Sequence, residues 1–292
     1  MPKKYSNIQH KSTNVRYNYR RHIVRLTILF LHNLFPISVE NFIKKQFFSP
    51  NHYPVTDQEI DLLNGSTSFE FQLHQKTIKC WRWGDGPYIL LAHGWNGHGS
   101  QFIYIIRRLI SAGYSVIIFD GPAHGQSEGT SSSYFQMTDA VRRLISFVKP
   151  ENILGLIGHS FGASAIINTI SKENIFKKII LLAPALNIQK ILEDTFLSYG
   201  ISINVLYKLI YEYEQTFDYN LKNDNPVNLV KSIEQELLII HDKDDTVTPH
   251  IDSKKISNTY KNIHIKTTTG LGHKRILIDP QVAKWIIKYL KK

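Results

Sequence analysis

Residues 153–162 read ILGLIGHSFG, an apolar run that leads directly into the pentapeptide GHSFG at 158–162. The run at 153–157 predicts a strand buried on both faces of a parallel sheet, and the residues after the pentapeptide predict a helix. The serine of G-x-S-x-G then stands on a sharp strand-to-helix turn. Strand and helix approach closely there, so the flanking positions must be small. We therefore expect Ser160 to be a nucleophile, with Gly158 and Gly162 as structural residues around it.

Short apolar runs and helix-length segments alternate along most of the chain. With 153–157, the runs that predict strands number eight, the others being 69–73, 77–83, 88–92, 115–119, 178–182, 236–240 and 263–267. Helices are predicted at about 101–112, 137–148, 162–172, 250–260 and 280–291. A tight turn joins the first two runs, which indicates an antiparallel hairpin. The alternation predicts an α/β fold with a mostly parallel, eight-stranded, doubly wound sheet.

One interval breaks this alternation. No buried-strand run lies between 182 and 236, yet residues 188–217 are apolar and aromatic enough for two or three helices. We expect a small helical lid at about 186–232, inserted after the sixth strand near the edge of the sheet where ligands bind. The α/β domain as a whole is expected over 55–292. Aromatic residues in the lid favour an apolar acyl or aromatic substrate, although such residues also pack lids onto their domains.

A serine hydroxyl needs a base, and the base needs an acid to orient it. His273 lies in the glycine-flanked stretch GLGH at 270–273, after the last predicted strand. Three carboxylates, Asp242, Asp244 and Asp245, follow the strand at 236–240. Both positions lie at the carboxyl ends of strands, as Ser160 does, so the order Ser, Asp, His converges at one edge. Spacing alone does not separate Asp244 from Asp245.

The negative charge that forms when a serine attacks an acyl carbon needs two hydrogen-bond donors, which are most often backbone N–H groups. The N–H of Phe161, directly after Ser160, is one candidate. The stretch HGWNG at 93–97 follows another buried strand, and there the N–H of Trp95 is the second candidate. Gly94 is expected to be structural beside this site.

Five motifs in one order make residues 69–292 resemble the α/β-hydrolase superfamily: HGW at 93–95, DGPAHGQS at 120–127, GHSFG at 158–162, HDKDDTVTP at 241–249 and GLGH at 270–273. The resemblance implies that the aspartate of D-x-V-x-P, here Asp245, is the triad acid. It also implies that the residue after His-Gly, here Trp95, lends the second oxyanion amide. Asp120 and His124 are implied to be structural. The chain departs from the pattern at Asp242, where a glycine is usual.

These residues predict a serine hydrolase that cleaves a carboxylic ester, thioester or lactone through an acyl-enzyme intermediate, with no metal or organic cofactor. Acyl transfer to an alcohol or amine by the same triad is one alternative, because pocket and lid choose the acceptor. A protein that binds a ligand or partner on the same fold without catalysis is another.

The charge of the chain is concentrated at its beginning. Residues 1–39 hold seven Lys or Arg and no Asp or Glu, and the rest holds 28 basic against 24 acidic residues. We therefore expect no nucleic-acid partner for the core. The apolar stretch at 23–35 is short and interrupted by Arg25 and His32, which disfavours a transmembrane helix or a signal peptide.

We thus expect a basic, partly amphipathic helical segment over residues 1–54. Two interpretations stay open: a helix packed on the catalytic domain, or, through residues 1–35, a peripheral contact with an anionic membrane. The single cysteine, Cys80, lies in a strand-like run and is expected to be buried and inert. It forms no intramolecular disulfide, which favours a reducing, cytoplasmic location, membrane-peripheral in the second interpretation.

Overall fold

The computed structural model of the chain describes residues 27, 34–172 and 175–292. Most of the predicted basic segment, 1–54, therefore lies outside the described residues. The described chain forms two compact units, one of residues 48–188 with 217–292 and the other of residues 34–47 with 189–216. The first unit holds all the strands, and each unit is described by itself.

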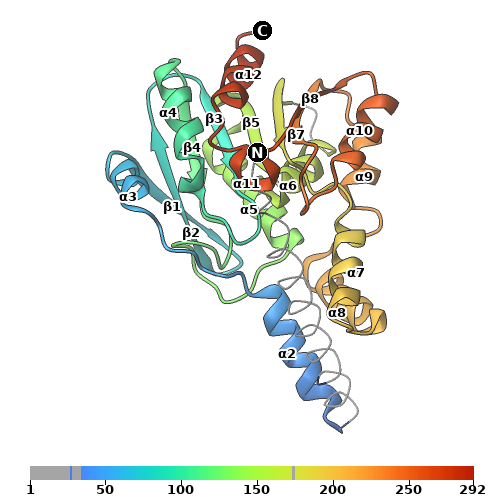
Figure 1. Cartoon of the computed structure of the whole chain (residues 1–292). Coiled ribbons are helices and arrows are strands. Elements are labelled where there is room, and N and C mark those ends of the chain that lie inside the picture. Colours follow the sequence, from blue (N-terminus) through green and yellow to red (C-terminus); the bar gives the residue numbers. More distant parts are fainter. Residues whose placement is uncertain (1–26, 28–33, 173–174) are drawn as a thin grey trace, which may run out of the picture. The chain divides into compact units, whose positions relative to one another are not determined.

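The eight-stranded, mostly parallel sheet is confirmed. Its order is β1-β2-β4-β3-β5-β6-β7-β8 (Figure 1). The first two strands form the predicted hairpin, β2 pairs antiparallel with β4, and every later pair is parallel. The strands are β1 (Thr67–Leu73), β2 (Lys76–Trp83), β3 (Tyr88–Ala92), β4 (Ser115–Phe119), β5 (Ile153–His159), β6 (Lys178–Leu182), β7 (Leu237–Asp242) and β8 (Ile263–Thr268).

The strand order reverses direction beside β3, and this reversal determines where a site forms. After β3 the chain moves to β4 on one side, and β5 then pairs with the other side of β3. Loops that leave β3 and β5 therefore part at the carboxyl edge and open a crevice there. HGWNG directly follows β3, and GHSFG spans the end of β5 and the turn after it.

Two apolar layers cover the sheet because successive side chains of a strand point to opposite faces. On β3, Leu90 belongs to the cluster that includes side chains of α5 and α6, whereas Ile89 and Leu91 belong to the cluster with α4 and α12. All three are fully buried. Burial of each such side chain contributes roughly 1.5–3 kcal/mol, so the two layers hold the sheet between its helices.

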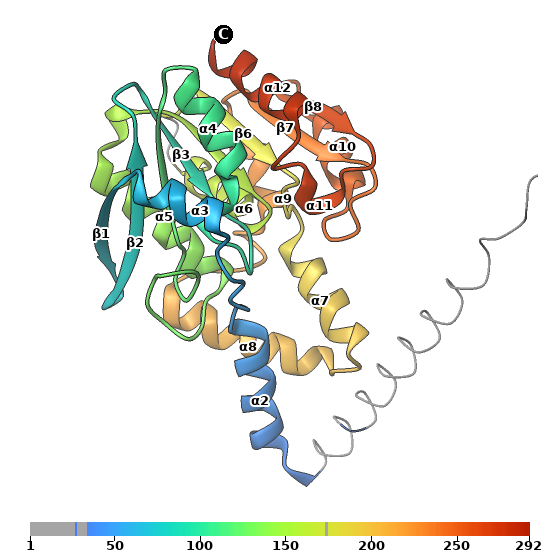
Figure 2. The ribbon, with the colours of Figure 1, turned by 60° about the vertical axis from the view of Figure 1, so that its left-hand side comes forward.

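The helices of the sheet unit lie close to the predicted positions. They are α4 (Ile103–Ser111), α5 (Tyr134–Val148), α6 (Phe161–Ile170), α10 (His250–Thr259) and α12 (Pro280–Leu290), with short α9 (Pro226–Leu229) and α11 (Gly272–Arg275). The sequence analysis did not predict α3 (Asp57–Asn64), shown in blue in Figure 2. Its start is marked by a capping box, in which Thr56 and Glu59 bond each other's backbone N–H.

The second unit consists of α2 (Pro36–Phe48, up to residue 47), α7 (Ile188–Ser198, from residue 189) and most of α8 (Ile203–Phe217). Ion pairs Lys44–Glu212 and Lys208–Glu40 join α2 to α8, and the ring of Phe47 lies 4.1 Å from that of Phe196 on α7. Residues 217–292 group with the sheet unit. Among the described residues, no helix is long and apolar enough to cross a membrane.

Candidate active site

Ser160 stands on the turn between β5 and α6 with φ 53° and ψ −119°, a strained conformation for a residue with a side chain. Its backbone is held on both sides, because its N–H donates to Leu182 O and its carbonyl accepts from the Ser164 N–H. The side chain is largely buried. The turn therefore has the geometry that the GHSFG motif predicts.

The three predicted structural glycines each have a steric reason to lack a side chain. A Cβ on Gly158 would lie 2.5 Å from Ala163 Cα, and one on Gly162 would overlap the carbonyl of Ala92. A Cβ on Gly94 would lie 2.8 Å from Ser160 Cβ. The loop after β3 thus approaches the serine as closely as backbone allows.

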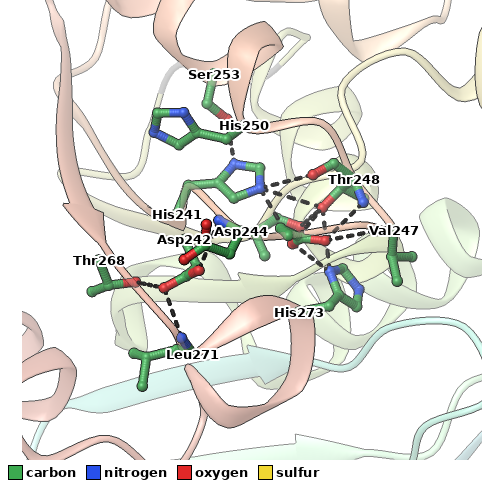
Figure 3. A network of polar contacts seen from close by, with 12 residues as sticks. His241, Asp242, Asp244, Val247, Thr248, His250, Ser253, Thr268, Leu271 and His273 are labelled. Carbon is green, nitrogen blue, oxygen red and sulfur yellow. Dashed lines mark hydrogen bonds and ion pairs between the residues drawn. The ribbon is translucent and has the colours of Figure 1, made fainter. Parts of the chain in front are cut away.

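The structure brings His273 and Asp245 together. His273 lies in α11, beyond β8, and its Nδ1–H donates to Asp245 Oδ2 at 2.7 Å (Figure 3). The Asp245 side chain is fully buried, and that of His273 is 11% exposed. The backbone N–H groups of Val247 and Thr248 both donate to Asp245 Oδ1, at 2.8 and 3.0 Å. The backbone of its own loop therefore fixes the orientation of the Asp245 carboxylate independently of His273.

The other two carboxylates near β7 have different partners. Asp242 Oδ2 accepts from Thr268 Oγ1 at 2.7 Å and from the Leu271 N–H at 3.0 Å, which ties the β7 loop to the segment that carries His273. Asp244 Oδ2 accepts from the Gly270 N–H at 2.8 Å. Among the described residues, neither Asp242 nor Asp244 forms a hydrogen bond to His273. The additional carboxylate at 242 thus supports the loop of the base.

The charge of Asp245 is stabilised by its donors. Burial alone raises the pKa of this carboxyl, but hydrogen bonds from His241 and His273 outweigh it and hold the pKa well below its usual range. The group is therefore ionised at neutral pH. An ionised carboxylate is what keeps an imidazole oriented with its other nitrogen free to accept a proton.

His159 connects the serine turn to His273. Its Nε2–H donates to the backbone carbonyl of His273 at 2.9 Å, and the two rings lie 4.7 Å apart. Burial, together with the neighbouring His273, lowers the pKa of His159 to about 3, so the ring is neutral. Among the described residues no hydrogen bond joins the Ser160 hydroxyl to His273. Hydrogen bonds between a catalytic serine and its base often form fully only when substrate is bound.

The loop after β3 is held by His93. The Gly121 N–H donates to its Nε2 at 2.8 Å, and its Nδ1–H donates to Gly94 O at 2.8 Å. The Trp95 ring lies 5.7 Å from that of Phe161. Among the described residues, neither the Trp95 N–H nor the Phe161 N–H donates to a backbone carbonyl outside the helices and strands.

Asp120 and His124, expected to be structural, are both buried. The Asp120 carboxylate accepts from the Gly99 and Gln126 N–H groups at 2.7 Å each. The His124 ring lies 5.2 Å from Trp95. Both therefore support the loops around the site.

Sequence reasoning did not identify His159, His241 or Thr248 as parts of the network. Thr248 Oγ1 lies 3.0 Å from Asp245 Oδ2 and 3.2 Å from His273 Nδ1, and His241 Nε2 lies 3.3 Å from the same carboxylate oxygen. Their position inside GHSFG and HDKDDTVTP was the available signal. No spacing rule, however, states which side chains of a loop turn inward.

The chain is similar to several known proteins. The family model described as serine aminopeptidase, S33, matches residues 87–225, which include Trp95 and Ser160. A lysophosphatidylserine lipase, ABHD12, of Gallus gallus is 29% identical over 233 residues. That match covers 70% of this chain and 58% of the relative, so the chain spans little more than half the length of that protein.

Two solved structures are similar in fold. The esterase Pf2001 of Pyrococcus furiosus has a TM-score of 0.63 and 19% identity, over 83% of this chain and 98% of that one. Est1E of Butyrivibrio proteoclasticus, with ferulic acid bound, has a TM-score of 0.60 and 17% identity, over 77% of this chain and 100% of that one. At these identities the likeness concerns the fold alone.

Proposed function

Because the chain belongs to the α/β-hydrolase superfamily, we propose that it is a serine hydrolase that cleaves ester-type bonds through an acyl-enzyme intermediate. The observation that carries the proposal is the buried Asp245–His273 pair at 2.7 Å. This pair is joined through the backbone of His273 to the residue directly before the strained Ser160.

In the proposed reaction, His273 Nε2 takes the proton of Ser160 as its Oγ attacks the acyl carbon. The N–H groups of Trp95 and Phe161 donate to the oxyanion that forms. The protonated His273, oriented by Asp245, then gives its proton to the leaving oxygen or sulfur. A water molecule, deprotonated by the same imidazole, cleaves the acyl-serine and regenerates the hydroxyl. No cofactor takes part in this scheme.

For the substrate we propose an ester with an apolar acyl group. Relatives named as lysophosphatidylserine lipases and neighbours named as esterases support this class. The aromatic residues of α7 and α8 contribute less to the argument than the sequence indicated. Phe196 is buried against Phe47 and Tyr213 is largely buried, so these two pack helices together.

Hydrolysis of p-nitrophenyl esters tests the proposed activity. We expect release of p-nitrophenol from the acetate and butyrate esters, because a short acyl chain needs little space in the pocket. The rates should depend on acyl chain length. The measurement is kcat/KM across a series from acetate to palmitate. Absence of release above the buffer rate for every ester would contradict the proposal. A sharp preference for long chains would assign the enzyme to lipid substrates.

We also propose that residues 1–35 make a peripheral contact with an anionic membrane on the cytoplasmic side. The seven basic residues in this stretch, with no acidic residue among them, support the contact. The cytoplasmic side is supported by the single cysteine, Cys80, which forms no intramolecular disulfide. Cys80 lies fully buried in β2, where burial raises the pKa of its thiol and leaves it unreactive.

Removal of four arginines tests this contact. Each basic residue near an anionic surface contributes about 1 kcal/mol, so the full-length variant with glutamine at 16, 20, 21 and 25 should bind phosphatidylserine-containing vesicles more than tenfold more weakly. Cosedimentation measures the binding. The matched control replaces four exposed lysines of the sheet unit, Lys255, Lys261, Lys284 and Lys291, and should bind like the wild type. Equal loss in both variants would rule out a specific contact through the first 35 residues.

A further inference from the structure

Resting on the proposed function, we propose that His241 is a positioning residue: its Nε2–H holds the Asp245 carboxylate in the orientation that His273 requires. In the established pattern of a triad, one imidazole contacts the acid. Here two imidazoles, those of His273 and His241, contact the Asp245 carboxylate. His241 lies in β7, four residues before Asp245, and its side chain is completely buried.

The contacts of His241 fix which nitrogen carries the proton. Its Nε2 lies 3.1 Å from the carbonyl oxygen of Thr248 and 3.3 Å from Asp245 Oδ2 (Figure 3). Both are acceptors, so Nε2 must be the protonated nitrogen. On the opposite side of the ring, Nδ1 lies 2.8 Å from Ser253 Oγ on α10, and the hydroxyl donates to it. Ser253 thus anchors the ring in the tautomer that faces the carboxylate.

The contact acts on the oxygen that bonds the base. Asp245 Oδ2 accepts from His273 Nδ1 at 2.7 Å and from Thr248 Oγ1 at 3.0 Å, and His241 Nε2–H, which also bonds the Thr248 carbonyl, lies 3.3 Å from it. The other oxygen is held by two backbone N–H groups of the same loop. Without His241 the inner side of Oδ2 would face a void or an apolar group. The carboxylate would then be freer to turn, and more of its negative charge would act on His273.

Several titratable groups face this network, and a test must separate their effects from that of His241. The side chains of Lys254 and His250 on α10 act electrostatically on this network. Asp242 lies directly after His241, and His159 faces the network from the serine turn. His250 is the natural control. Its ring lies 5.4 Å from that of His241, and its Nε2 bonds Thr267 Oγ1 at 3.0 Å. His250 therefore contacts the His241 ring but does not bond the Asp245 carboxylate.

The experiment compares His241→Phe, His241→Gln and the control His250→Phe in full-length protein, with kcat and KM for an ester measured across pH. A hydrogen bond to a charged group is worth about tenfold in rate, so His241→Phe should lower kcat about tenfold with KM nearly unchanged. The acidic limb of its kcat/KM profile should move to higher pH, because a less neutralised Asp245 stabilises protonated His273. Glutamine places a donor near the position of Nε2, so it should restore most of kcat and the wild-type limb.

A merely structural role would lower thermal stability without moving the limb. The inference is overturned if His241→Phe keeps the wild-type limb, if its loss of kcat does not exceed that of His250→Phe, or if glutamine is as damaging as phenylalanine. Should His241→Phe not fold, Ser253→Ala carries the test. It removes only the anchor of the ring and should move the limb in the same direction, and an unchanged profile would overturn the inference. A wild-type protein without esterase activity would instead contradict the proposed function.

Discussion

Replacement of Ser160 by alanine should lower kcat for ester hydrolysis on the order of 10⁶-fold and leave KM and the fold nearly unchanged. The fold survives because the bonds that hold residue 160, from its N–H to Leu182 O and from the Ser164 N–H to its carbonyl, belong to the backbone. Only the hydroxyl that forms the acyl-enzyme is lost. Steady-state kinetics with p-nitrophenyl butyrate, together with the thermal midpoint, measure both expectations.

The matched control for this variant is Ser171→Ala at the far end of α6. Its hydroxyl donates to Asn168 O at 2.8 Å and contacts no part of the proposed triad. We expect this variant to retain the activity of the wild type. Comparable activity in Ser160→Ala and the wild type would mean that the nucleophile is another group.

Replacement of Asp245 by asparagine should lower kcat by about 10⁴-fold, and the reason lies in the contacts of the two carboxylate oxygens. Oδ1 accepts two backbone N–H groups, so the asparagine carbonyl must occupy that position. Its NH₂ group then lies where Oδ2 faced His273 and His241. A donor facing His273 Nδ1 forces the proton to Nε2, the nitrogen that must accept the proton of Ser160.

Asp244→Asn is the control for this prediction because it changes the same charge one residue away. Asp244 is exposed and accepts from the Gly270 N–H, a bond that an asparagine oxygen also forms. Kinetics for the two variants should therefore differ by about three orders of magnitude or more. A larger loss in Asp244→Asn than in Asp245→Asn would move the triad acid to position 244.

The serine turn could be predicted from sequence because its geometry is local. Gly158 and Gly162 lie two residues from Ser160, and the contacts that exclude a side chain at both involve the strand and helix that the same pattern predicts. The sheet could be predicted for a similar reason. Each central strand is a short apolar run with buried faces on both sides, as Leu90 and Ile89 illustrate.

The contacts of the acid loop could not be predicted, because they depend on residues far away in sequence. Asp242 is directed away from His273 by Thr268 and Leu271, which are 26 and 29 residues further along the chain. His241 faces Asp245 only because Ser253 on α10 holds the other side of its ring. The superfamily resemblance proposed Asp245, whereas the contacts of all three carboxylates give a physical reason for that choice.

The N-terminal part of the chain shows a further limit. The sequence left two interpretations of residues 1–54, and the described part, 34–47, groups with α7 and α8 through Lys44, Glu212 and Phe47. Ion pairs between helices that are separated by more than 150 residues leave no periodic pattern. The capping box at Thr56, by contrast, was a readable signal for α3 that the analysis did not use.

The most direct test of the central claim is to identify the residue that a fluorophosphonate modifies. These reagents phosphonylate a serine only when a neighbouring base and oxyanion donors activate it, so they report the assembled site rather than the serine alone. Labelled full-length protein would be digested and the adduct located by mass spectrometry. The account predicts one adduct, on Ser160, absent in Ser160→Ala and strongly slowed in Asp245→Asn. Folded wild-type protein that stays unlabelled, or that labels equally as Ser160→Ala, would contradict it.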